Sequence, residues 1–202
     1  MVVEQDTIPP IKTTRLTGEY MADSASPSRT QIPADSQAIL DSFQKLFGFV
    51  PNIFAVMAQS PHALAAFKGL QIPLERTLDA AMRDRIALAV SEMNSCDYMV
   101  RAHTYIGAQF SKLDVTELKM NRYGRSSDPK IDVALQFAKK VTETRGKVKG
   151  SDLQEVRDAG WTDAQVIEII ARVTQFLYAN FVSNVFETEI DFPALEAIAD
   201  EA

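Results

Sequence analysis

The sequence is poor in the residues that carry disulfide, metal and phosphate chemistry. Among 202 residues it has one cysteine and two histidines. One cysteine cannot form an internal disulfide, and these residue types together supply too few ligands for a zinc site of the usual nitrogen and sulfur kind. A glycine-rich phosphate loop and a Gly-x-Ser-x-Gly nucleophile turn are also missing. We therefore expect neither a bound metal nor an organic cofactor.

The chain also lacks an excess of positive charge and a long apolar run. It has 27 acidic and 21 basic residues, for a formal net charge of −6. Nucleic acids and anionic membranes attract clustered lysine and arginine, so neither is an expected partner. No apolar run approaches the roughly 20 residues that span a bilayer, and the N-terminus lacks the apolar centre of a secretory signal. The expected location is the cytoplasm.

Composition along the chain divides it into two parts. Residues 1–34 are rich in serine, threonine, aspartate and proline and have weak hydrophobic periodicity. We expect this segment to be an extended or partly disordered arm. Residues 35–202 are enough for one domain with a well-buried core.

Hydrophobic periodicity from residue 35 onward is typical of helices. Apolar residues between Ile39 and Phe47 follow one helical stripe, and Gly48 closes it. Helix starts are predicted where a capping side chain precedes such a stripe. The capping residues are Ser60, Asp79, Asp114, Asp128, Ser151 and Thr162. No alternating stretch of strand length is present, so the predicted fold class is all-α.

Two long apolar helices are expected, at 79–93 and at 162–181. Each follows a short helix and a capped turn, which gives the two halves of the domain a similar order of elements. This order suggests a duplicated helical hairpin.

The single cysteine lies in a segment with a distinctive arrangement. Asn94 and Ser95 predict a helix cap, which places Cys96 in the first turn of the next helix. Unpaired backbone N–H groups and the helix dipole lower the pKa of a thiol at that position. Cys96, Met99 and His103 then fall at i, i+3 and i+7, on one helix face.

Proton transfer is the chemistry that this face suggests. His103 can exchange protons with a group held near Cys96 or Met99, directly or through water. Asp84 and Glu92 lie on the preceding predicted helix, and either can orient the imidazole. A purely structural interpretation competes with this one, because a lone cysteine is most often a small buried apolar residue and a lone histidine is most often packed or solvated. Spacing alone favours the structural interpretation.

A family resemblance changes that balance. The segment resembles the active-site motif of the alkyl hydroperoxidase D and carboxymuconolactone decarboxylase family, which is an acid, eleven intervening residues, and then Cys-x-x-Cys-x-x-x-His. Asp84, Cys96, Met99 and His103 stand at those positions. The resemblance extends over about residues 43–193 and is greatest to the peroxidase-related branch. Further matching segments are Phe49-Val50-Pro51-Asn52-Ile53-Phe54, Ser60-Pro61, Arg85 to Glu92 and Thr188 to Pro193.

The resemblance implies an all-helical fold built on a duplicated helical unit and assembled as trimers or hexamers. It also implies that Cys96, His103 and Asp84 are the catalytic residues. In family peroxidases two cysteines cycle between dithiol and disulfide while histidine and glutamate relay protons. Here Met99 replaces the second cysteine, Asp84 stands where a glutamate is usual, and Ser183-Asn184 stands where the branch often has Asn-His. These departures indicate an altered function.

Residues near the C-terminus are candidates for a binding pocket. We expect the aromatic side chains Phe176, Tyr178, Phe181, Phe186 and Phe192 to form core and subunit interface, and an aromatic wall around an apolar ligand is the alternative. Asn180 and Asn184 lie at i and i+4 and can supply polar contacts to such a ligand. Together with Met99 and Glu92 they complete the predicted substrate pocket.

Three functions remain open from the sequence. The first is a one-cysteine, thiol-dependent hydroperoxide reductase, in which Cys96 becomes a sulfenic acid that an external thiol reduces. The second is a non-redox decarboxylase, isomerase or cyclase on the same scaffold, with His103 as general acid or base and Asp84 as its orienter. The third is a non-catalytic, oligomeric ligand-binding protein. We expect a small-molecule substrate, either a hydroperoxide or a small lactone or keto acid, and a homo-oligomer.

Overall fold

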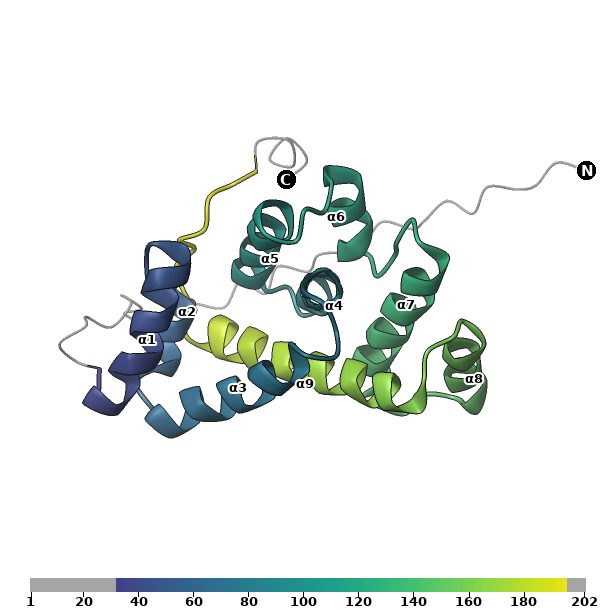
Figure 1. Cartoon of the computed structure of the whole chain (residues 1–202), viewed down its shortest axis with the longest axis horizontal. Helices are drawn as coiled ribbons and strands as arrows, with labels where there is room; N and C mark the ends of the chain where they lie inside the picture. The colour runs from purple at the N-terminus through teal and green to yellow at the C-terminus, as the bar shows by residue number, and fades with distance from the viewer. Residues whose placement is uncertain (1–31, 196–202) are drawn as a thin grey trace, which may run out of the picture.

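The computed structural model describes residues 32–195, and within that range it consists of nine α-helices without a β-strand (Figure 1). The helices are α1 (Ala34–Phe47), α2 (Asn52–Met57), α3 (Pro61–Leu74), α4 (Ala80–Met93), α5 (Asp97–Gln109), α6 (Val115–Arg122), α7 (Pro129–Thr144), α8 (Gly150–Asp158) and α9 (Asp163–Val185). The predicted all-α fold is confirmed. Most of the predicted N-terminal arm, residues 1–31, lies outside the described residues.

Local capping explains where several helices begin. The Asp79 carboxylate accepts a hydrogen bond from the backbone N–H of Met82 at 2.7 Å and starts α4. Thr162 accepts from the N–H of Gln165 at 3.2 Å and starts α9. These side chains satisfy N–H groups that the first helical turn leaves without partners. Both starts were predicted from the sequence.

The predicted cap at Ser151 is wrong. Helix α8 already begins at Gly150, with Lys149 as its N-cap residue, so Ser151 lies within the first turn. The physical reason is the carboxylate of Asp152, which accepts a hydrogen bond from the Lys149 backbone N–H at 2.7 Å. A carboxylate three residues after the N-cap satisfies that donor and fixes the helix start.

Helix α4 is the centre of the fold. It packs against α5, α6, α7 and α9, and Figure 1 shows it end-on with these helices around it. The five consecutive residues from Ile86 to Val90 are all buried, as expected for a helix that is covered on every side. The 23-residue helix α9 runs along α3, α4 and α7 and links the two ends of the molecule.

A tight turn joins α4 to α5 and determines how α5 starts. Ser95 adopts a positive φ of 49°, and Cys96 follows as the N-cap of α5 with a non-helical backbone. Left-handed backbone is uncommon for a residue other than glycine, and here it reverses the chain within a few residues. The two helices lie in extensive contact, so residues on their facing sides meet.

Two further observations concern the surface. No helix among residues 32–195 is long and apolar enough to cross a membrane. Helix α9 leaves several apolar side chains exposed, namely Ile167, Ile170, Phe181 and Val185. The homo-oligomer expected from the sequence stays a prediction.

Candidate active site

Asp84 and His103 meet between α4 and α5. The His103 Nδ1 atom lies 2.9 Å from the Asp84 Oδ1 atom. The Asp84 side chain is fully buried, and His103 retains a small exposed fraction. Of the two carboxylates considered from the sequence, the structure therefore places Asp84 beside the imidazole.

Two further groups hold the Asp84 carboxylate. Arg83 donates from Nε to Oδ1 at 3.0 Å and from Nη2 to Oδ2 at 3.2 Å, and the Ser111 hydroxyl also donates to Oδ2. Burial alone raises the pKa of Asp84, but the hydrogen bond to His103 and the charges of His103 and Arg83 outweigh it and hold that pKa below its ordinary value. Asp84 is thus an ionised carboxylate at neutral pH.

An ionised carboxylate fixes the protonation of its histidine partner. It can accept hydrogen bonds but cannot donate one, so the Nδ1 atom of His103 carries the proton that points to Asp84. The other ring nitrogen, Nε2, is then the atom that can accept a proton from a substrate. The ring is held further by an edge-to-face contact with Phe176, whose centroid lies 5.0 Å away.

His103 faces a cavity of about 260 Å³. Side chains from α1, α2, α3, α4, α5 and α9 and from the segment after α9 form its walls. The lining is largely aromatic, and its phenylalanines are Phe43, Phe47, Phe54, Phe67, Phe110, Phe176 and Phe192. An apolar cavity with few polar groups is the usual form of a small-molecule site.

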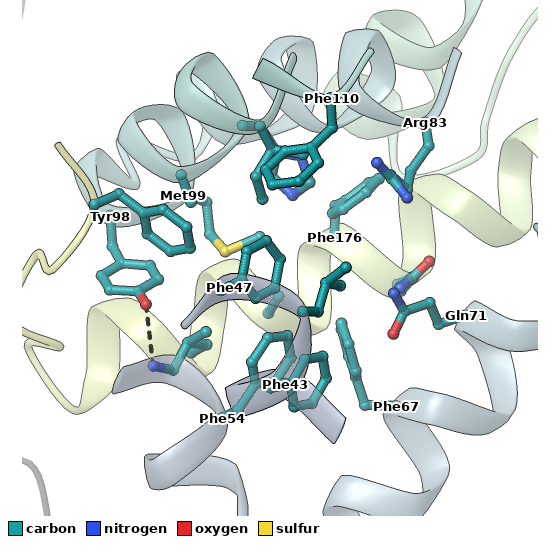
Figure 2. A pocket seen from close by; sticks show the side chains of 18 of the residues that line it. Phe43, Phe47, Phe54, Phe67, Gln71, Arg83, Tyr98, Met99, Phe110 and Phe176 are labelled. Atoms are coloured by element: carbon teal, nitrogen blue, oxygen red, sulfur yellow. Dashed lines mark hydrogen bonds between the residues drawn. The ribbon is translucent and has the colours of Figure 1, made fainter. Parts of the chain in front are cut away.

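Figure 2 shows that the cavity has two unlike ends. Tyr98 and Met99 lie at one end, and Arg83 and Gln71 lie at the other. The rings of Phe43, Phe54 and Phe67 lie along one side between these ends. Met99 thus lines the cavity with His103, and its role in a substrate pocket stays a prediction.

Cys96 does not line this cavity. Its side chain is fully buried, and the Ser183 hydroxyl and the Met99 backbone N–H are hydrogen-bonded to its sulfur. Burial raises the pKa of the thiol above its ordinary value, and these hydrogen bonds offset that effect in part. The predicted low pKa is therefore wrong. Its premise also fails, because Cys96 is the N-cap residue of α5 and not a residue of its first turn.

Three other predicted pocket residues lie away from the cavity lining. Glu92 forms an ion pair with Arg122, with Oε2 and Nε 2.7 Å apart. Asn180 is fully buried and accepts a hydrogen bond from Ser91 at 3.0 Å. Asn184 donates to the backbone oxygen of Asn94 at 3.0 Å and ties α9 to the turn before α5. Each of the three is engaged in contacts between helices.

Several cavity residues were not predicted from the sequence. One of them is Arg83, whose place in the chain next to the predicted site residue Asp84 was the available sign that it lies near the site. The rings of α1 and α2 gave no such signal, because apolar periodicity shows that a helix face is buried and not what it faces. Of the aromatic residues first expected in the core, Phe176 and Phe192 line the cavity. For those two residues the alternative of an aromatic wall describes their position.

The fold and site together define an all-helical protein with a buried aspartate–histidine pair facing an apolar cavity. The family model for the carboxymuconolactone decarboxylase family matches residues 58–140, which include Asp84, Cys96, Met99 and His103. This match and the similar structures below confirm the resemblance to that family and to its alkylhydroperoxidase D-like, peroxidase-related group that the sequence motifs predicted. None of the curated proteins matches the chain.

Solved structures similar to the chain share its fold. An uncharacterised peroxidase-related protein with an alkylhydroperoxidase AhpD core, from Ralstonia eutropha JMP134, is 26% identical with a TM-score of 0.74, and the match covers 83% of this chain and 90% of that one. A peroxidase-related protein from Silicibacter sp. TM1040 is 25% identical with a TM-score of 0.71, again over 83% and 90% of the two chains.

A third similar structure is that of the debrominase Bmp8. It is 18% identical to this chain with a TM-score of 0.67, and the match covers 83% of this chain and 91% of Bmp8. At this identity the likeness concerns the fold alone.

Proposed function

We propose that this protein is a non-redox enzyme of the carboxymuconolactone decarboxylase family in which His103 transfers protons to and from a small, largely apolar substrate. The observation that carries the proposal is the contrast along α5: His103 and Met99 line the cavity, whereas Cys96 does not and is fully buried. A group that never meets the substrate cannot be its nucleophile. Substrate chemistry therefore falls to the imidazole, which has an ionised aspartate behind it.

The proton step needs no redox partner. His103 Nε2 accepts a proton from a carbon next to a carbonyl, and the C–H electron pair moves into the carbonyl to form an enolate. Where a C=C bond is conjugated with the enolate, return of the proton to the far carbon of that bond shifts the double bond and isomerises the substrate. In a β-keto acid the bond to the carboxyl carbon breaks instead, carbon dioxide leaves, and a protonated His103 supplies the proton to the remaining carbanion. Asp84 stabilises the imidazolium in either case.

The one-cysteine hydroperoxide reductase has less support. That reaction requires a thiolate that meets the peroxide, but Cys96 is a buried thiol with a raised pKa. Met99 also stands where the resolving cysteine of the resembled motif stands, so an intramolecular disulfide cannot form.

Hydrogen exchange at carbon tests the proposal without knowledge of the full reaction. The purified protein is incubated in D₂O with a panel of small ketones, lactones and keto acids that have apolar bodies, and NMR follows the replacement of hydrogen by deuterium next to the carbonyl. We expect catalysed exchange with at least one class of compound. Removal of the base in His103→Ala is expected to slow that exchange by a factor of about 100 to 10,000.

The matched control is Cys96→Ala, which removes the thiol without touching the cavity lining. We expect it to exchange at the wild-type rate. Exchange that stays at the uncatalysed rate across the panel, or that is lost with Cys96 and retained without His103, would show that the proposal is wrong.

A further inference from the structure

Arg172 lies in the interior beside the proposed site with part of its guanidinium unpaired. Its side chain on α9 is fully buried. The Nη1 atom donates to Gln175 Oε1 at 2.7 Å, but Nε and Nη2 have no hydrogen-bond partner in the part of the chain that the structure describes. No carboxylate among the described residues forms an ion pair with it.

Burial of a guanidinium with so few partners lowers the stability of the folded protein. An arginine keeps its charge at neutral pH, and a buried charge without a partner loses its hydration with little in return. Burial, and then the nearby charge of Arg83, lowers the pKa of Arg172 to about 10, which still leaves it charged at pH 7. Two guanidinium groups thus act on one region, where Asp84 is already engaged by Arg83 and His103. The exposed Glu75 also lines the cavity, and its charge raises the pKa of Arg172 without forming an ion pair that the described residues show.

Arg172 determines which hydrogen-bonding group of Gln175 is available to a ligand in the cavity. Gln175 lines the cavity, and its Oε1 atom is occupied by Arg172. Because an amide has one oxygen acceptor and one NH₂ donor, the group that Gln175 retains for another partner is the Nε2 donor. Arg172 thereby orients Gln175 as a hydrogen-bond donor.

Two more polar side chains line the same cavity, namely Gln71 and Arg83, whose charge acts on Arg172. The two hydrogen bonds of Arg83 to Asp84 use Nε and Nη2, so they leave its Nη1 group out. Gln71 lines the cavity with a buried Oε1 atom that lacks a hydrogen-bond partner in the described residues. A half-turn of this amide presents Nε2 instead, which adds a third donor. Arg83 and Gln71 lie together at one end of the cavity in Figure 2.

We propose that this end of the cavity, formed by Arg83, Gln175 and Gln71 with Arg172 behind Gln175, binds the carboxylate of an otherwise apolar monocarboxylate. These three side chains line the cavity and can offer amide or guanidinium donors there, and a carboxylate supplies acceptors for them. Arg172 is a positioning residue, because it acts through Gln175. The aromatic walls hold the apolar body of the ligand beside His103.

This inference rests on the proposed function for the identity of the cavity as a substrate site, and it goes further by naming an anchoring group. The anchored carboxylate is not the group that reacts, so a monocarboxylate held in this way undergoes the proton transfer between carbons and not the loss of carbon dioxide. It fixes one end of the molecule at Arg83, while the carbon that exchanges protons lies within reach of His103. A ligand without the negative charge fits the same walls but leaves the donors unsatisfied.

A pair of ligands of equal shape tests the inference. Isothermal titration calorimetry at pH 7 compares 3-phenylpropanoate with 3-phenylpropanamide on the wild-type protein. We expect the carboxylate to bind about tenfold more tightly or better, because charge-assisted hydrogen bonds replace neutral ones. Equal affinities, or no binding of either compound, would overturn the inference. This comparison needs no variant, so it stays decisive if a substitution of the buried arginine prevents folding.

Two variants separate positioning from simple loss of charge. Arg172→Met keeps the length of the side chain, and we expect it to remove most of the preference for the carboxylate while 3-phenylpropanamide binds as before. Arg157→Met is the matched control, since Arg157 is an exposed arginine on α8, and we expect it to keep the preference. A preference that survives Arg172→Met would contradict the role given to Arg172.

The binding experiment and the exchange experiment fail independently. Binding that prefers the carboxylate in both the wild type and His103→Ala, together with an absence of carbon exchange, would support the anchor and reject the proton chemistry. Exchange that depends on His103, together with equal binding of the two ligands, would support the chemistry and reject the anchor.

Discussion

The two ends of one short stretch of chain differ in what they face. Met99 and His103 line the cavity between the helices, whereas Cys96, three residues before Met99, is buried against Ser183 of α9. Helical spacing puts all three on one face only if all three are helical. Cys96 is the N-cap residue, with φ −100° and ψ 86°, so its side chain does not follow that face. A shift of one residue in a helix start therefore removes the thiol from the cavity, and for this reason we assign the proposed chemistry to the imidazole.

The largest expected effect on stability comes from removing the Asp84 carboxylate, which pairs with His103. Asp84→Asn takes the charge away from both Arg83 and His103, and breaking a buried pair by one partner costs about 3 kcal/mol. We expect the free energy of unfolding in urea to fall by that amount. The control Glu143→Gln removes an exposed carboxylate from a surface pair and is expected to change little.

The lowered pKa of Asp84 predicts that the stability of the protein depends on pH. The pKa of Asp84 in the folded protein lies below its ordinary value of 3.8, so its stabilising effect is present above that pH and is lost as the pH falls through the folded pKa. Unfolding measured from pH 6 down to pH 2 is therefore expected to show a smaller loss of stability in Asp84→Asn than in the wild type. Parallel curves would contradict the assignment of Asp84 as a buried, ionised group.

A cysteine at position 99 instead of position 96 tests whether the two positions differ in access to the cavity. Met99→Cys in a Cys96→Ala background places the only cysteine on the cavity side, one turn from His103. We expect iodoacetamide to alkylate this thiol about tenfold faster than it alkylates Cys96 of the wild type, because it is accessible through the cavity. Mass spectrometry of the modified peptides gives both rates, and similar rates would mean that the two positions do not differ as described.

The smallest expected effect concerns the segment that closes the cavity beside Tyr98. The Tyr98 hydroxyl donates to Asp191 Oδ1 at 2.8 Å, and Phe192 lines the cavity next to it. Tyr98→Phe keeps the ring and removes this bond together with the one that the hydroxyl accepts from the Ile53 backbone N–H at 3.3 Å, so we expect a loss of about 2 kcal/mol in the free energy of unfolding. Tyr105→Phe is the control, because Tyr105 contacts Phe192 through its ring. Equal changes in the free energy of unfolding for the two substitutions would show that the hydrogen bonds of the Tyr98 hydroxyl do not stabilise the fold.

The sequence predicted the parts of the molecule that depend on local pattern. Helix caps at Asp79 and Thr162 follow from capping chemistry. Spacing left both Asp84 and Glu92 open as partners of His103, and the family resemblance favoured Asp84, which the structure places beside the imidazole. Ser95 was the residue that misled the prediction: its positive φ extends the turn by one residue and makes Cys96 the cap. Serine is an ordinary capping residue, so its type gave no warning.

The cavity itself required the tertiary structure. Its walls combine α1 and α2 with α9 and with Phe192, which lie far apart in the chain. Periodicity shows that Phe43 and Phe176 are buried, but it does not show that both line the same cavity. The sequence likewise did not predict that Arg172 Nε and Nη2 lack a partner among residues 32–195, because an arginine in an apolar helix is normally expected to reach the surface.

The most direct test of the account is the rate at which Cys96 forms a sulfenic acid. The folded protein is exposed to hydrogen peroxide and to an organic hydroperoxide, a sulfenic acid trap is added, and peptide mass spectrometry follows Cys96 in the wild type and in His103→Ala. We predict a rate no faster than that of a free cysteine and unchanged by the loss of His103, since burial keeps the thiol protonated and away from the cavity. A rate well above that of free cysteine, and slowed in His103→Ala, would contradict the account and restore Cys96 as the reacting group.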